Sequence, residues 1–257
     1  MQMYLSLHKS EKADRVPAIH KDLSLANRLI GSLPAHDRAL FLERSELVEL
    51  KIHKVLTQAG QPAEHAYFPV DSFVSVILPV EDSPHLEVGL VGNEGMCNTS
   101  LVLGVNISSF TNLVQGTGRA FCIDRNTLQQ QLHESSSLRE VLMRYVSVRE
   151  NHLAQQAACL NYHTVEQRLA RWLLMTRDRT HSSEIFLTHE VLSLMLGARR
   201  ESVSQAASTL QKRGLISYNR GYVMLLDEYQ LETTACRCYK ADLRVYHRIL
   251  ALQTVRI

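Results

Sequence analysis

The 257-residue chain lacks long apolar runs and any Cys-x-x-Cys pair. No stretch approaches the roughly 20 apolar residues that a transmembrane helix needs. Met1–Lys21 has no apolar core behind a basic start, so no signal peptide is expected. Five scattered cysteines are compatible neither with a disulfide framework nor with a zinc ribbon. We therefore expect a soluble, cytoplasmic protein that does not bind a membrane.

Cys236 and Cys238 form the one close cysteine pair. On a helix, residues two positions apart point in different directions, so shared metal ligation is awkward. We expect these cysteines to act as ordinary small apolar residues. No residue is assigned as a metal ligand or as a catalytic group.

Charge is distributed unevenly along the chain. Residues 1–160 carry 14 Lys and Arg against 17 Asp and Glu, whereas residues 161–257 carry 14 against 9. Cationic side chains release counterions when they meet DNA phosphates, so the basic C-terminal third suits a nucleic-acid-binding module.

The first half of the chain is rich in short β-forming segments separated by turns that contain glycine or proline. This spacing predicts an antiparallel barrel or sandwich, which we place at residues 25–123. Helical periodicity over Leu25–Leu50 predicts one or two short helices before the strands, with a break at Leu33-Pro34. The expected strands are Lys51–Gln58, Ala66–Pro69, Ser72–Val80, Leu86–Val91, Asn112–Gln115 and Gly118–Ile123.

The pattern becomes helical at Asp124, and residues 124–161 are expected to form connecting helices. Asp124 and Ser135–Ser137 are suitable N-caps, and a long helix is predicted from about Leu138 to Leu160. This helix either packs on its own β-domain or pairs two subunits, and we favour the dimer. Its expected dimer residues are Leu138, Val141, Leu142, Tyr145, Val148 and His152.

A helix-turn-helix pattern follows in the expected domain 162–240. Thr188 is a suitable N-cap for a short helix that ends at Gly197, where glycine permits a left-handed turn. A second helix starts near Arg199 and stops before Gly214. Two short strands then flank Asn-Arg-Gly as a wing, and Arg220 is placed to contact phosphate. Residues 241–257 are expected to form a helical extension.

The second helix of this pattern has one polar face. Arg200, Ser204 and Ser208 form one row four residues apart, and Glu201 and Gln205 form the next. Arginine can pair with guanine, glutamine with adenine, and glutamate with the cytosine amino group. A plain helical hairpin with a solvated face is the alternative, but the helix, glycine turn, helix and wing occur together.

Residues 187–226 resemble the winged helix-turn-helix of the Crp/Fnr superfamily, with Arg200-Glu201-Ser202-Val203 at the start of the recognition helix. The resemblance implies an α+β fold: a jelly-roll-like antiparallel β-roll, a long dimerisation helix and a C-terminal winged helix-turn-helix. It also implies a homodimer on double-stranded promoter DNA, with RNA polymerase as a further candidate partner. The expected DNA contacts are Thr188, Arg199, Arg200, Glu201, Ser202, Ser204, Gln205 and Arg220.

The β-roll of this superfamily often binds an effector. Relatives that bind cyclic AMP carry an arginine that neutralises its phosphate, but here Ser108-Ser109 stands at that place. Glu94, Gly95, Ser108 and Ser109 are the candidate pocket residues, and cyclic nucleotide binding is not expected. The oxygen-sensing branch uses N-terminal cysteines, and none precedes Cys97, which excludes that iron–sulfur cluster. Haem ligation stays open at His53, His65 and His85, so the effector is unknown.

The sequence has two rival interpretations. An enzyme is disfavoured because His189-Glu190 begins a zincin motif that fails at Ser193, and Gly116–Phe121 matches only the start of a dinucleotide fingerprint. The other rival is a β-roll sensor or scaffold whose winged helix binds protein. Steep salt dependence of binding would favour DNA over protein as the partner.

Overall fold

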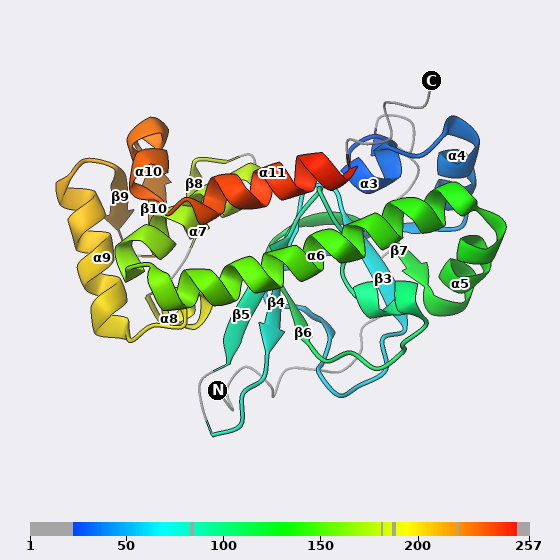
Figure 1. Ribbon diagram of the computed structural model, residues 1–257, viewed down its shortest axis with the longest axis horizontal. Helices are drawn as coiled ribbons and strands as arrows, with labels where there is room; N and C mark the ends of the chain where they lie inside the picture. The colour runs from blue at the N-terminus through cyan, green and yellow to red at the C-terminus, as the bar shows by residue number, and fades with distance from the viewer. Residues whose placement is uncertain (1–22, 83–84, 181, 187–188, 220, 251–257) are drawn as a thin grey trace.

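The computed structural model describes residues 23–82, 85–180, 182–186, 189–219 and 221–250. Strands dominate as far as Asp124, helices follow, and a small sheet returns near the C-terminal end. The architecture is an antiparallel β-roll, a long helix and a winged helix-turn-helix (Figure 1). The predicted α+β fold class is therefore confirmed. Within the described residues, no helix is both long and apolar enough to cross a membrane.

Two antiparallel sheets form the β-roll. In the first sheet, the central strand pairs on both sides, in the order β1 (Glu46–Leu50), β7 (Gly118–Asp124) and β3 (His65–Pro69). The second sheet runs in the order β2 (Val55–Thr57), β6 (Thr111–Gly116), β4 (Phe73–Leu78) and β5 (Leu86–Val91). A 3-10 helix, η1 (Thr99–Leu103), lies between β5 and β6.

The N-terminal helices end earlier than the sequence predicts. The helices α3 (Arg28–Gly31) and α4 (Ala35–Glu43) flank the predicted break, with Pro34 at the N-cap position of α4. The prediction of helix as far as Leu50 is wrong, because Glu46–Leu50 pairs with β7 as a strand. In that strand, pairing with β7 and burial of its apolar side chains outweigh the local helical spacing. The first predicted strand is regular only over β2.

The caps predicted for the next two helices are confirmed. Asp124 accepts hydrogen bonds from the amides of Asn126 and Thr127 at the start of α5 (Arg125–Glu134), each at 3.0 Å. Ser135 accepts one from the amide of Leu138, also at 3.0 Å, and so begins α6 (Ser136–Tyr162). These acceptors satisfy amides that have no partner within the helix.

The apolar stripe of α6 lies against the β-roll of its own chain. Tyr145 is 1% exposed and shares one core with Phe68 and Phe121 of the first sheet. Side chains buried in their own core are unavailable to a second subunit, so the structure corrects their assignment to a dimer seam. The buried stripe comprises Leu138, Val141, Leu142, Tyr145 and Val148.

The C-terminal domain contains the predicted helix-turn-helix and wing. The φ angle of Gly197 is +55°, which confirms the left-handed turn between its two central helices. A hairpin of two strands confirms the wing, and a third strand pairs with it. The elements are α7 (Val165–Thr180), β8 (Glu184–Phe186), α8 (His189–Leu196), α9 (Arg200–Lys212), β9 (Ile216–Asn219), β10 (Tyr222–Leu225) and α10 (Glu228–Thr234).

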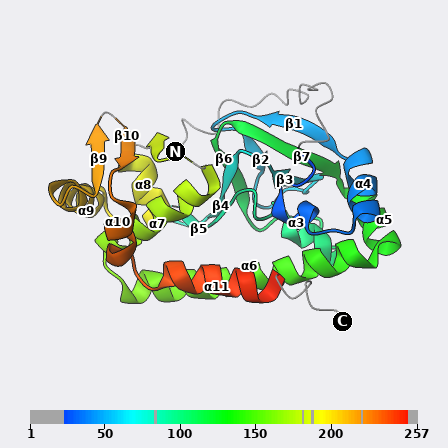
Figure 2. The same ribbon diagram turned by 90° about the horizontal axis from the view of Figure 1, so that it is seen from above.

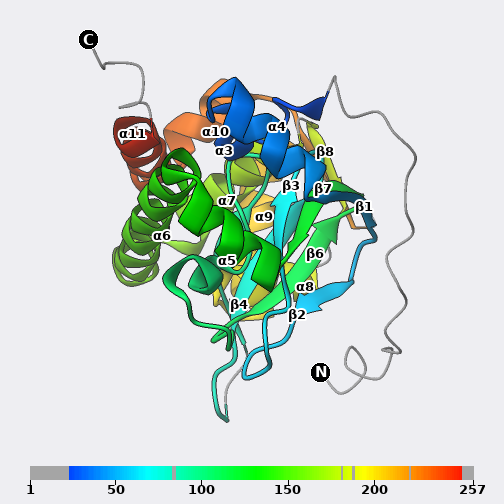
Figure 3. The same cartoon turned by 90° about the vertical axis from the view of Figure 1, so that its right-hand side faces the viewer.

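A last helix, α11 (Cys238–Leu250), returns toward the β-roll and packs along α6 (Figures 2 and 3). It begins three residues before the predicted extension. The Tyr246 hydroxyl donates to the carbonyl of Glu94 at 2.9 Å, which fixes α11 to the roll. His152 of α6 faces this helix, with Nε2 at 3.9 Å from a carboxylate oxygen of Asp242, so its dimer assignment is corrected too. Burial lowers the pKa of His152 to about 3, and nearby Arg149 adds to the effect.

Candidate nucleic-acid interface

The helix α9 has two chemically different faces and lies at the outer edge of its domain (Figure 1). Its inner face packs against α7, α8 and β9. The buried inner residues are Val203, Ala206, Ala207 and Leu210. Small alanines in this position let neighbouring helices approach closely. The opposite face is consequently held rigidly toward solvent.

The outer face of α9 carries the predicted base-reading side chains. Arg200, Glu201 and Gln205 are all exposed and lie within the first two turns. Ser202 and Ser204 are half-buried beside them, and Arg199 is exposed at the N-cap position. The structure thus brings six of the eight predicted DNA contacts together. The other two, Thr188 and Arg220, lie outside the described residues.

The start of α9 is suited to phosphate. Arg199 has an extended backbone there and makes no side-chain cap, because a guanidinium has no acceptor atom. The first-turn amides of a helix carry partial positive charge and bind anions readily. A duplex that approaches this end would meet these amides and the Arg199 side chain together.

The end of α9 is fixed by its own ion pair. The guanidinium of Arg213 lies 2.8 Å from the Glu166 carboxylate of α7 and donates to the Thr234 hydroxyl of α10 at 2.9 Å. These contacts set the orientation of α9 within the domain. Arg213 is therefore a positioning residue rather than a base reader.

Two exposed aromatic rings lie beside the wing, and sequence reasoning did not single them out. Phe186 of β8 and Tyr222 of β10 are 48% and 51% exposed. Their ring centroids are 5.0 Å apart in an edge-to-face arrangement. Only the pairing of β8 with β10, which places Phe186 opposite Tyr222, brings these distant residues together.

Two buried polar contacts join the winged helix-turn-helix domain to the β-roll. The Trp172 indole of α7 donates to the Glu87 carboxylate of β5 at 2.8 Å, and the Ser75 hydroxyl donates to the same carboxylate at 2.5 Å. Arg179 of α7 forms an ion pair with Glu94 at 2.8 Å. Burial raises the pKa of Glu87 to about 7, although both hydrogen bonds act in the opposite direction.

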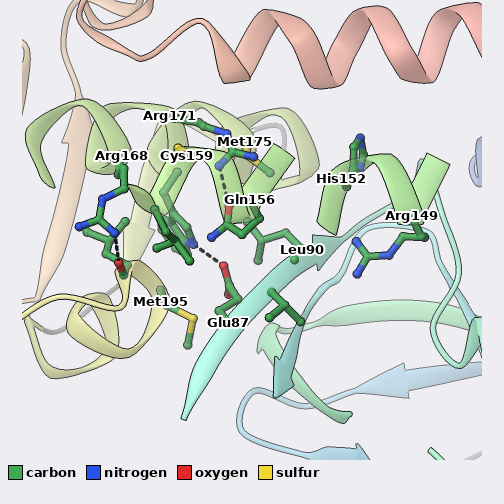
Figure 4. A pocket seen from close by; sticks show the side chains of 15 residues that line it. Glu87, Leu90, Arg149, His152, Gln156, Cys159, Arg168, Arg171, Met175 and Met195 are labelled. Atoms are coloured by element: carbon green, nitrogen blue, oxygen red, sulfur yellow. Dashed lines mark hydrogen bonds between the residues drawn. The ribbon is translucent and has the colours of Figure 1, made fainter. Parts of the chain in front are cut away.

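Figure 4 shows this junction, with Glu87 pointing from β5 toward α7. Arg168 donates to the Leu196 carbonyl at the end of α8, at 2.7 Å. A cavity of only about 30 Å³ remains between the parts, so the two domains are closely packed here. The helix α9 is therefore held in a defined orientation relative to the roll.

A second cavity, of about 90 Å³, lies inside the β-roll against α6. Ser108 and Ser109 line it, but the Ser108 hydroxyl already donates to the Phe110 carbonyl at 2.7 Å. Ser100 also lines it, with a buried hydroxyl that has no hydrogen-bond partner in the described chain. The roll thus offers polar groups to a small ligand.

The cavity also contains a cation that the sequence did not reveal. Arg149 of α6 lines it and is 92% buried, with no carboxylate partner among the residues described. The family's phosphate-binding arginine is expected in the strand region, whereas this arginine comes from the helix that covers the roll. The spacing of residues in the strands therefore could not predict that Arg149 lines the cavity.

The other two predicted effector residues lie elsewhere. The Glu94 carboxylate is engaged by Arg179, and Gly95 packs against Tyr145 so closely that an added Cβ would lie 1.9 Å from its hydroxyl. Neither residue lines the cavity that contains Ser108 and Ser109. The predicted pocket of four residues is therefore corrected to the serine pair alone.

Residues 167–234 match the family profile of the Crp-like helix-turn-helix domain. The chain is 24% identical over 192 residues to the CRP-like cAMP-activated global transcriptional regulator of Mycobacterium tuberculosis, a match covering 71% of this chain and 84% of that protein.

Solved structures with a similar fold include the c-di-GMP responsive global regulator CLP of Xanthomonas campestris. It has a TM-score of 0.61 and 20% identity, and the alignment covers 75% of this chain and 99% of that one. A CRP-family transcriptional regulator of Thermus thermophilus has a TM-score of 0.62 and 19% identity, with coverage of 73% and 95%. At this level of identity, the likeness establishes the fold.

Replacing Glu87 with Gln is expected to remove a pH-dependent part of the stability. The folded-state pKa of about 7 exceeds the usual carboxyl value, so the contribution of Glu87 is fully present below pH 4.5 and is lost as the pH rises through about 7. Urea unfolding at about pH 5 and about pH 8 measures this. Wild type should lose more stability than Glu87→Gln over that interval, and equal losses would contradict the assignment.

Proposed function

We propose that this chain, a regulator of the Crp/Fnr family, binds operator DNA as a homodimer and reads base edges with α9. The match of residues 167–234 to the Crp-like helix-turn-helix profile and the similarity to a transcriptional regulator support this proposal. One observation carries the proposal: Arg200, Glu201 and Gln205 are exposed together at the N-terminal end of a rigidly held helix. This is the end at which a helix-turn-helix reaches into the major groove.

Each of these side chains has a distinct role in the proposal. Arg200 donates two hydrogen bonds to guanine, Gln205 pairs with adenine, and Glu201 accepts from the cytosine amino group. Arg199, Ser202 and Ser204 contact sugar and phosphate around them. Such backbone contacts set the register of the protein but carry no sequence information.

The proposed domains follow the elements of the chain. The β-roll with its N-terminal helices covers residues 25–123, connecting helices cover 124–161, and the DNA-binding domain covers 162–240. The extension 241–257 begins within α11. The regulator would act in the cytoplasm, and contact with RNA polymerase stays a prediction with no surface assigned.

The dimer contact is proposed on the outer face of α6. With the inner stripe buried on the roll and α11 along another side, a row of small and polar side chains together with one methionine remains toward solvent. Its members are spaced four and three residues apart in alternation, which suits a paired helix. They are Met143, Ser147, Glu150, Ala154, Ala157 and Asn161.

The β-roll cavity is proposed to bind a small anion rather than cyclic AMP. Its volume of about 90 Å³ is well below the roughly 300 Å³ at which drug-sized ligand pockets begin. Arg149 is buried there without a carboxylate among the described residues, and a buried charge is costly unless it is paired. An anion beside Arg149 would satisfy it and would contact the helix that leads to the DNA-binding domain.

One substitution tests the base contacts proposed for α9. Arg200→Ala is expected to weaken binding to a duplex selected from a random library by about 1–3 kcal/mol, or roughly 5- to 150-fold, because the guanine contact is lost. Binding to non-specific DNA should change far less. Arg244→Ala on α11, which is also exposed, serves as the control. Gel shifts at several salt concentrations measure binding to the selected duplex and to non-specific DNA. Salt-independent capture of a protein partner instead of DNA would support the scaffold alternative.

Another substitution tests the dimer contact proposed on α6. Ala154→Arg places a charge in the centre of the outer face of α6 and is expected to convert the dimer to a monomer, because close helix packing has no room for it. Tyr229→Arg on α10, where the side chain is 75% exposed, should leave the dimer intact. Light scattering after size-exclusion chromatography measures the mass, and a dimeric Ala154→Arg protein would place the interface elsewhere.

Ligand titrations test the anion proposed to bind in the β-roll cavity. Calorimetric titration with cyclic AMP is expected to show no micromolar binding, because the cavity is too small for a nucleotide. Inorganic phosphate, titrated in a phosphate-free buffer, should bind wild type more tightly than Arg149→Gln. Micromolar cyclic AMP binding, or equal phosphate binding by both proteins, would contradict the assignment.

A further inference from the structure

Four side chains that commonly bind metals converge where α6, α7 and α11 meet. Cys159 lies in the last turn of α6, and His163 follows as the C-cap of that helix. Cys236 precedes α11, and Cys238 is its first residue. Their donor atoms all lie within 4.8 Å of one another. The three cysteines are buried, and the histidine is half-buried.

We propose that Cys159, His163, Cys236 and Cys238 together bind one Zn²⁺ ion. A tetrahedral zinc with bonds of about 2.3 Å to sulfur and 2.0–2.1 Å to nitrogen places neighbouring ligand atoms about 3.5–3.8 Å apart. The Cys159 and Cys236 sulfurs are 3.5 Å apart, and the Cys238 sulfur is 3.5 Å from His163 Nδ1. These two pairs already have nearly tetrahedral spacing, and the remaining donor pairs, all within 4.8 Å, need to close by no more than about 1 Å.

The donor set indicates which metal this is. Three thiolates and one imidazole match the Cys₃His sites in which zinc is held structurally, with all four positions supplied by protein. Thiolates are poor ligands for magnesium, calcium and manganese, which prefer oxygen. An iron–sulfur cluster divides its ligands among two or more irons, whereas these four donors surround a single point. A single zinc ion is therefore favoured.

Two arginines offset the charge of such a site. Three thiolates with one Zn²⁺ carry a net charge of −1, which is costly when buried without a cation. Arg168 and Arg171 interact electrostatically with Cys159, and both line the cavity beside it (Figure 4). The Nε atom of each is buried with no hydrogen-bond acceptor in the described structure. The site thus lies where negative charge on sulfur is stabilised.

One neighbour also orients a ligand directly. The Gln155 amide donates to the Cys238 sulfur at 3.0 Å from the adjoining turn of α6. Hydrogen bonds of this kind hold a metal ligand in the correct orientation and commonly affect metal affinity. Gln155 is accordingly assigned as a positioning residue for the zinc site.

The position of the site defines what the ion does. His163 separates the end of α6 from the start of α7, so it lies at the joint between the β-roll helix and the DNA-binding domain. Cys236 and Cys238 hold the start of α11 against the same joint. A zinc ion would cross-link three segments and restrict movement of the DNA-binding domain about α6. This role is independent of the base contacts proposed for α9.

The test measures metal in the full-length protein, purified under reducing conditions without an affinity tag. Mass spectrometry of the metal content is expected to give about one zinc per chain. His163→Ala and Cys238→Ser should lose the ion, whereas Cys122→Ser, which changes a cysteine outside the cluster, should keep it. Gln155→Ala should retain zinc but bind it about 10- to 100-fold more weakly in competition with a chelator.

Cobalt provides a second readout that does not depend on how well a variant folds. Wild-type protein stripped of metal and kept reduced should take up one Co²⁺ and develop thiolate-to-cobalt charge-transfer bands with strong tetrahedral absorption. Absence of zinc together with failure to take up cobalt would overturn the proposal. Metal retained by Cys238→Ser, or a Cys159–Cys236 disulfide whose reduction restores no metal binding, would overturn it as well.

Discussion

The burial of one face of α6 on the β-roll determines where the other parts of this molecule lie. The helix has 27 residues and so extends for about 40 Å, far longer than the sheet it covers. Its first half buries Leu142, Tyr145 and Val148 in the roll, which fixes both the position and the rotation of the helix. The second half extends past the roll and carries the DNA-binding domain, α11 and the cysteine–histidine cluster. The side of α6 that faces away from the roll and from α11 is the one proposed to contact a second subunit.

This arrangement couples the two domains through polar contacts as well as through the helix. Glu87 and Glu94 belong to the roll, while their partners Trp172 and Arg179 belong to α7. Breaking a buried contact of this kind leaves a polar group without a partner, so a few such bonds can define one orientation of α9. Arg149 lies on the same helix as the joint, between the β-roll cavity and this junction. A ligand in the roll would therefore contact the element on which the recognition helix is mounted.

Much of the fold could be predicted from local sequence patterns. Asp124 and Ser135 signalled their helix starts, and Gly197 signalled the turn between α8 and α9, because caps and left-handed turns need particular residues at particular positions. The exposed face of α9 could also be predicted, since the helical repeat assigns each side chain to one side of the helix. The strand at Glu46–Leu50 could not be predicted from local patterns. Its pairing partner lies some 70 residues away, and pairing with it outweighs the helical spacing of the strand's own residues. Cys159 and Cys236 are separated by 77 residues, so no spacing rule could bring them together.

Local sequence patterns were sufficient to predict the α+β class, the winged helix-turn-helix and the side chains on the exposed face of α9, since each depends on periodicity or on a local backbone requirement. Which neighbour each face meets depends on how the elements pack in three dimensions. A stripe of apolar residues shows that a helix will be buried, but it does not say whether its partner is a sheet of the same chain or a second subunit. For the same reason, Arg149 and the four donors of the proposed zinc site become visible only after the helices have packed.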